Sequence, residues 1–83
     1  MEIIKYEKQN IIKKIKNLKS VIEHEFKSIE KYNIKLKKMK QQTPKQQNNY
    51  LLCLLTIEEK SEYYNKLNND LIFLKNTLKL ISK

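Results

Sequence analysis

The sequence predicts an all-α fold of two long antiparallel helices, a coiled-coil hairpin that forms one domain over residues 1–83. Three observations lead to this prediction. The chain has no Gly and a single Pro, which removes most of the residues that strands and tight turns need. Apolar residues recur at heptad spacing in both halves of the chain. A polar stretch that contains the only Pro separates the two halves, so one boundary is expected.

The first expected helix covers about residues 2–41 and follows one heptad frame. The run of apolar a and d positions is long enough to indicate a coiled coil instead of a chance amphipathic stretch. Only Lys8 and Glu25 place charged side chains at these positions. The a positions are Met1, Lys8, Ile15, Ile22, Ile29 and Leu36, and the d positions are Ile4, Ile11, Leu18, Glu25, Tyr32 and Met39.

A turn is expected at about residues 42–43, because Pro44 cannot continue a helix but suits the first position of a new one. Thr43 is then the N-cap, and Gln46 three residues later completes a capping box. A connection this short predicts that the two helices are antiparallel neighbours.

The second expected helix covers about residues 44–82 and follows a second heptad frame. Each helix would have about 40 residues and a length of roughly 60 Å at the usual rise per residue. Lys60 is the only charged residue at a core position of this frame. The a positions are Tyr50, Ile57, Tyr64, Leu71 and Leu78, and the d positions are Cys53, Lys60, Leu67, Leu74 and Ile81.

Glu25 and Lys60 are the two charged core positions that lie at nearly equal distances from Thr43. A hairpin folded at Thr43 would bring them within about one helical turn of each other, where they would help to fix the register of the helices. The alternative is that both side chains extend outward from an imperfect seam and do not interact.

The sequence contains no recognisable catalytic, cofactor or metal site. His24 falls at a solvent-facing c position, and a catalytic histidine needs a positioned partner and a pocket. Cys53 falls at a core d position, where cysteine behaves as a small apolar residue. No Cys/His cluster has zinc-ligand spacing, and a chain without Gly has no Gly-rich phosphate loop. We therefore expect a protein that is not an enzyme and needs no cofactor.

The single cysteine cannot form an internal disulfide, which favours a reducing compartment. The N-terminal residues lack the apolar core of a signal peptide. The longest apolar run, from Tyr50 to Leu55, is far shorter than the roughly 20 residues that cross a bilayer. The sequence therefore predicts a cytoplasmic protein, with a nuclear one as the alternative, and no membrane span.

The second helix has more apolar surface than one seam can cover. Apolar residues at b, c and f positions make the segment from Tyr50 to Leu55 apolar all round, which for a helix indicates burial on more than one side. A partner helix, a second copy forming a four-helix bundle, or a client protein would cover this surface. Alternatively, these are scattered exposed residues of an ordinary kind. The candidate partner-binding residues are Leu51, Leu52, Leu55, Ile72, Phe73 and Leu80, and Ile12, Val21 and Phe26 widen the seam of the first helix.

The chain carries a formal charge of +9, and all its basic residues are Lys. Most of this charge lies in residues 1–42. Two lysine clusters there could attract phosphate groups, so a small basic nucleic-acid-binding or ribosome-associated factor is the alternative function. Against it, Arg is absent and the tyrosines mostly occupy core positions instead of an exposed stacking surface. The candidate anion-binding residues are Lys13, Lys14, Lys16, Lys19, Lys35, Lys37, Lys38 and Lys40.

The first half also contains three runs, Ile11-Ile12-Lys13-Lys14-Ile15, Glu23-His24-Glu25-Phe26-Lys27 and Lys38-Met39-Lys40. These runs resemble the first helix of the tubulin-folding cofactor A family, over about half the chain. The resemblance implies a small helical chaperone that holds β-tubulin and has no enzymatic activity; it implies no particular binding residues. The chain departs from the family because it has no Pro after Pro44, where the family has a Pro-Asp step, and its length leaves no room for the family's third helix.

The sequence as a whole predicts a non-catalytic coiled-coil module for protein–protein interaction, either an assembly subunit or a chaperone-like factor. Its expected partner is another protein, helical or acidic, or a second copy of the chain.

Overall fold

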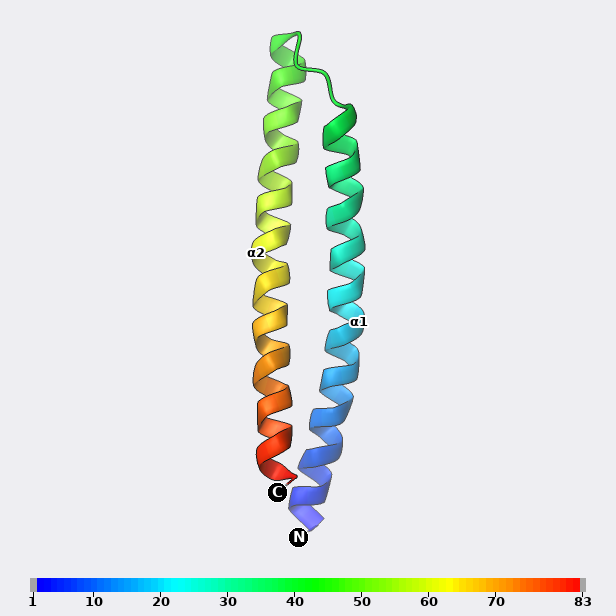
Figure 1. Ribbon diagram of the computed structural model, residues 1–83, viewed down its shortest axis with the longest axis vertical. Coiled ribbons are helices and arrows are strands. Elements are labelled where there is room, and N and C mark those ends of the chain that lie inside the picture. Colours follow the sequence, from blue (N-terminus) through cyan, green and yellow to red (C-terminus); the bar gives the residue numbers. More distant parts are fainter. Residues whose placement is uncertain (1, 83) are drawn as a thin grey trace.

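The computed structural model is a hairpin of two long antiparallel helices, shown in Figure 1, and it confirms the predicted all-α fold. Helix α1 spans Glu2–Lys38 and helix α2 spans Pro44–Ile81. The structure describes the backbone of residues 2–82 and the side chains of residues 7–82, and no strand occurs within that part of the chain. The predicted core side chains of Met1 and Ile4 lie outside it.

The hairpin is a thin rod with a large surface. It measures 66 × 15 × 14 Å, and its radius of gyration is 18.9 Å, whereas a compact domain of this length would have about 12 Å. The accessible surface is 7079 Å², against roughly 5300 Å² for an average folded monomer of the same mass. Each helix therefore covers only one strip of the other.

The seam follows both predicted heptad frames. From Lys8 to Ile81, each a and d residue named above is buried or half-buried, whereas most residues at other positions are exposed. Ile15, Cys53 and Leu67 are the most covered, with 8%, 6% and 7% of their surface accessible. None of the described side chains is completely enclosed, because two helices surround a core residue on only some of its sides.

Helix α1 ends at Lys38 and not near residue 41, so the predicted boundary was about three residues too late. The Met39 N–H donates to the Leu36 carbonyl at 3.1 Å, an i to i−3 bond that tightens and closes the last turn. Further on, the Gln41 carbonyl accepts a bond from Gln47 Nε2 at 3.1 Å. The Gln41 carbonyl is thus bonded to a side chain at the start of α2 instead of to a continuation of α1, and residues 39–43 form the connection.

The start of α2 has the predicted capping box. Gln46 N–H donates to Thr43 Oγ1 at 3.1 Å, and Gln46 Oε1 accepts from Thr43 N–H at 3.2 Å. The same Oε1 also accepts from Gln42 N–H at 3.0 Å. Thr43 has the extended backbone, φ −111° and ψ 156°, that is favoured before a proline, and Pro44 occupies the first turn. Helix α2 runs to Ile81, one residue short of the expected end.

Candidate interaction surface

Glu25 and Lys60 meet across the seam, as the first of the two alternatives predicted. Lys60 Nζ donates to Glu25 Oε1 at 3.3 Å. The side chains of Lys60 and Glu25 are only 28% and 13% exposed, so the pair is largely removed from water. The Lys60 ammonium also lies 5.5 Å from the centre of the Tyr32 ring, within the range of a cation–π interaction. Lys60 is therefore held by a carboxylate and an aromatic face of α1.

Two further contacts flank this ion pair. The Cys53 thiol lies 3.8 Å from the Tyr32 carbonyl oxygen, a weak hydrogen bond that crosses the seam. The rings of Phe26 and Tyr64 lie with their centres 6.0 Å apart and their planes inclined at 41°, within the range of favourable aromatic pairs. The middle of the hairpin is thus joined by interactions of different chemical kinds, which depend on the relative position of the helices.

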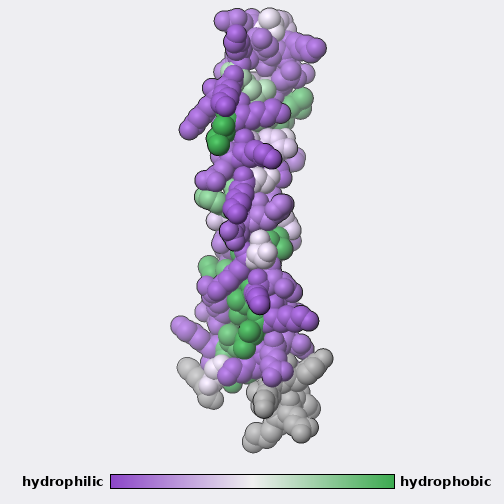
Figure 2. Space-filling view, turned by 90° about the vertical axis from the view of Figure 1, so that its right-hand side faces the viewer, coloured by the Kyte–Doolittle hydropathy of each residue, from purple (hydrophilic) through white to green (hydrophobic). Residues whose placement is uncertain are grey.

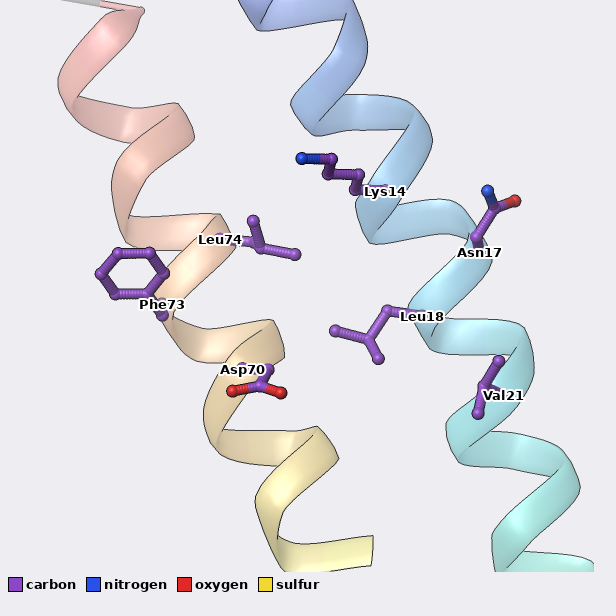
Figure 3. A pocket seen from close by; sticks show the side chains of 7 residues that line it. All are labelled: Lys14, Asn17, Leu18, Val21, Asp70, Phe73 and Leu74. Atoms are coloured by element: carbon purple, nitrogen blue, oxygen red, sulfur yellow. The ribbon is translucent and has the colours of Figure 1, made fainter. Parts of the chain in front are cut away.

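An open groove of about 490 Å³ lies between the helices nearer the chain ends, as Figure 3 shows. Leu18 and Leu74 both point into the gap between the helices, and the Phe73 ring on α2 borders the groove. No salt bridge joins the charged residues of the groove, Lys14 and Asp70, within the described side chains. Lys14, Asn17, Leu18 and Val21 of α1 and Asp70, Phe73 and Leu74 of α2 line the groove.

The six candidate partner-binding residues are all exposed, with 55% to 71% of their surface accessible. They form two patches on α2. The turn-proximal patch, close to the connection between the helices, consists of Leu51, Leu52 and Leu55. The terminal patch, toward the other end of the rod, consists of Ile72, Phe73 and Leu80. Helix α1 covers neither patch, because its contact with α2 runs along the a and d positions.

Sequence reasoning missed three further exposed apolar residues, Ile34, Leu54 and Tyr63, which are 56%, 38% and 47% accessible. The f position of Ile34 in the heptad frame would have identified it, whereas Leu54 and Tyr63 lie at e and g positions that flank the seam. The three residues expected to widen the seam, Ile12, Val21 and Phe26, are only partly covered. The exposed apolar surface is therefore larger than predicted from the sequence.

The eight candidate anion-binding lysines are all exposed. The seven that belong to α1 occupy b, c, e, f and g positions and so lie around its outer circumference instead of forming a single stripe, and Lys40 lies in the connection after α1. Figure 2 shows the α1 side of the rod as mostly hydrophilic, with hydrophobic residues in separate patches. The arrangement provides a diffuse positive potential but not a groove shaped for a phosphate backbone.

The remaining candidate groups lie where the heptad frames place them. His24 is exposed, and Cys53 is a buried free thiol. Among the described residues, no group of three or more His, Cys, Asp or Glu side chains could hold a metal ion. Neither described helix contains a stretch long and apolar enough to span a membrane.

Comparison with protein-family models, curated proteins and solved structures finds no match for this chain. The resemblance to the tubulin-folding cofactor A family therefore stays a prediction from the residues quoted above.

Proposed function

We propose that this protein is a non-catalytic coiled-coil module for protein–protein interaction, acting as an assembly subunit or a chaperone-like factor. The observation that carries the proposal is the turn-proximal patch. Cys53 turns inward and packs in the seam, while its neighbours Leu51, Leu52 and Leu55 remain more than half exposed on the outside of the same helix. A segment that is apolar on both its covered and its exposed sides is suited to contact a second protein.

The energetic advantage of covering these patches is substantial. Removing one large apolar side chain fully from water is worth roughly 1.5–3 kcal/mol. Because 55% to 71% of the surface of each patch residue is accessible, covering the rest contributes about half to two-thirds of that value, and covering several of them together offsets the cost of association. The hairpin alone leaves more surface accessible than an average monomer of its mass. A partner that packs along α2 would bring the burial per residue closer to that of an ordinary domain.

The partner proposed is a helical protein, a client with an acidic surface, or a second copy of the chain. The charge of +9 would steer an acidic partner toward the rod, while the apolar patches would supply most of the affinity. The resemblance to the cofactor A family makes β-tubulin one candidate client. A reducing compartment, the cytoplasm or the nucleus, is compatible with the single free thiol.

Affinity capture from the native cell tests this proposal when the wild type is compared with L51S/L52S/L55S, in which the turn-proximal patch becomes polar. We expect the wild type to retain a defined protein and the variant to lose it. The matched control is N48S/N65S/N69S, three polar exposed positions of the same helix. Sedimentation equilibrium of the wild type completes the test: a folded monomer at high concentration that also retains no protein would contradict the proposed function.

The alternative function, binding to nucleic acid or the ribosome, has the eight exposed lysines in its favour. Affinity that depends on phosphate contacts must fall steeply with salt concentration. Binding to a short duplex of arbitrary sequence at low and moderate salt therefore separates the two functions. Salt-sensitive binding that is unchanged in L51S/L52S/L55S would favour the basic factor, whereas weak binding at both salt concentrations would favour the protein-binding module.

A further inference from the structure

One side of α2, next to the seam, has a pattern of residues that is complementary to itself. Leu52, Glu59, Lys66 and Phe73 occupy successive c positions seven residues apart, and Tyr63 lies beside them at a g position in the middle. We call these five residues the α2 stripe. Residues seven apart stay on nearly the same side of a helix, with a drift of about 20° per heptad that a left-handed supercoil removes.

The α2 stripe is accessible. Leu52, Tyr63 and Phe73 are 55%, 47% and 70% exposed. Glu59 and Lys66 are also exposed, and neither takes part in an ion pair within the described residues. The structure therefore presents three large apolar side chains and two unpaired opposite charges along one line of the rod.

The order of these residues is apolar, acidic, basic and apolar, with Tyr63 at the centre. A second copy running in the opposite direction would place Leu52 opposite Phe73, Glu59 opposite Lys66 and, close to the two-fold axis, Tyr63 beside Tyr63. We propose that two copies of this protein pair in this way, antiparallel through their α2 stripes. The inference rests on the proposed function and names the second copy as the partner of this surface.

The charge distribution supports pairing through α2. Residues 1–42 contain 12 Lys and 5 acidic residues, whereas residues 43–83 contain 6 Lys and 4 acidic residues. Two copies that met through α1 would bring their strongly positive halves together, and like charges in contact are destabilising. Two copies that meet through α2 keep these halves apart and gain two equivalent Glu59–Lys66 contacts.

The remaining g positions are compatible with this register. Thr56 of one copy would lie close to Asp70 of the other, and the Thr56 hydroxyl, which donates to the Leu52 carbonyl at 2.9 Å, brings no second negative charge to that carboxylate. The contact from Leu52 to Phe73 would extend about 30 Å along the helix at 1.5 Å per residue, well within the 66 Å length of the rod. Aromatic residues such as Tyr63 and Phe73 are enriched at protein interfaces because they bury much area with few rotatable bonds.

Sedimentation equilibrium of the wild type and of charge variants tests this register. We expect the wild type to dimerise and E59K and K66E each to weaken the dimer about tenfold, since each variant turns two attractive contacts into repulsive ones. The double variant E59K/K66E should regain the affinity of the wild type, because the charges are exchanged and the pairing is kept. Circular dichroism checks that each variant remains helical.

The matched controls are E58K and K75E, which change the net charge as E59K and K66E do but lie at exposed positions outside the α2 stripe. Both controls should dimerise like the wild type within about twofold. Equal weakening by E58K and E59K, or a double variant that does not recover, would overturn the register. A monomeric wild type would overturn the pairing altogether. The proposed function would still stand if that monomer retained another protein through Leu51, Leu52 and Leu55, so the two failures are distinguishable.

Discussion

The Lys60 ammonium and the Glu25 carboxylate form an ion pair at 3.3 Å in a seam made mostly of apolar residues. Both groups belong to core positions, and Glu25 is only 13% exposed. A pair of this kind adds little net stability compared with two apolar residues, because both charges lose water. Its effect is on specificity, since a shifted register would leave each charge partly buried without its partner.

Changing either residue of the pair alone should destabilise the hairpin. We expect Glu25→Leu and Lys60→Leu each to lower the free energy of unfolding by about 1 to 3 kcal/mol, because the remaining charge is left without its partner. The double variant should recover most of this loss. Denaturant unfolding of the four proteins gives the coupling energy. Loss of register specification in the double variant should appear as higher-order association in sedimentation.

The chain contains a matched control for this cycle. Glu23 and Lys27 form an i,i+4 pair on α1 at 3.4 Å, with both side chains 70% exposed. Removing either of these should change stability by at most about 0.5 kcal/mol, because water replaces the lost partner. If the effects of Glu25→Leu and Lys60→Leu are simply additive, the two residues do not sense each other, and the register described here would be wrong.

The Tyr32 ring should contribute to holding Lys60. We expect Tyr32→Phe, which keeps the aromatic face, to unfold within about 0.5 kcal/mol of the wild type, and Tyr32→Leu to be less stable by about 0.5 to 1 kcal/mol through loss of the cation–π contact. Measuring both variants again in the Lys60→Leu background removes the contribution of packing. If the difference in unfolding free energy between Tyr32→Phe and Tyr32→Leu is the same in the Lys60→Leu background, the ring stabilises the hairpin through packing alone.

Much of this fold could be predicted from the sequence, because two long heptad frames and a single Pro leave few alternatives. The frames assign each described core position from Lys8 to Ile81, and the position of the turn gives the Glu25–Lys60 contact. The end of α1 could not be predicted in the same way. The Gln41 carbonyl and the Gln42 N–H form hydrogen bonds with the side chains of Gln47 and Gln46 instead of with the backbone of a longer α1. The heptad pattern does not predict which of these bonds forms.

The candidate surface was predicted less completely than the fold. The residues at b, c and f positions of α2 were identified because a two-helix seam cannot reach them, whereas Ile34, at an f position of α1, was missed although the same argument applies to it. Tyr63 and Leu54 were missed because e and g residues flank the seam, and their exposure depends on how closely the helices approach. The positions of the lysines around α1 follow from the same frame, although the sequence clusters suggested a more compact basic face.

The capping box should contribute measurably to stability because it joins the connection to α2. We expect Thr43→Ala to destabilise the hairpin by about 1 kcal/mol, which for a domain of this size lowers Tm by about 4–8 °C. Gln46→Ala should have a comparable effect, since Gln46 Oε1 accepts bonds from two backbone N–H groups. Thr77→Ala is the control, because the Thr77 hydroxyl bonds only to the Phe73 carbonyl of its own helix. Equal melting temperatures for Thr43→Ala and Thr77→Ala would contradict a stabilising role for the cap.

The Cys53 thiol should report directly on opening of the seam. It is 6% exposed and lies against the Tyr32 carbonyl, so a thiol reagent can reach it only when the helices separate. We expect labelling to be at least about a hundredfold slower than in C53A/N48C, whose thiol would lie at an exposed position; an opening free energy of about 3 kcal/mol is sufficient for this ratio. Glu25→Leu should accelerate the labelling of Cys53, because it lowers the free energy of opening, and should leave the rate of C53A/N48C unchanged. Labelling of Cys53 as fast as that of the exposed control would mean that the helices separate readily in solution, and the seam could not then hold the patches of α2 in place for a partner.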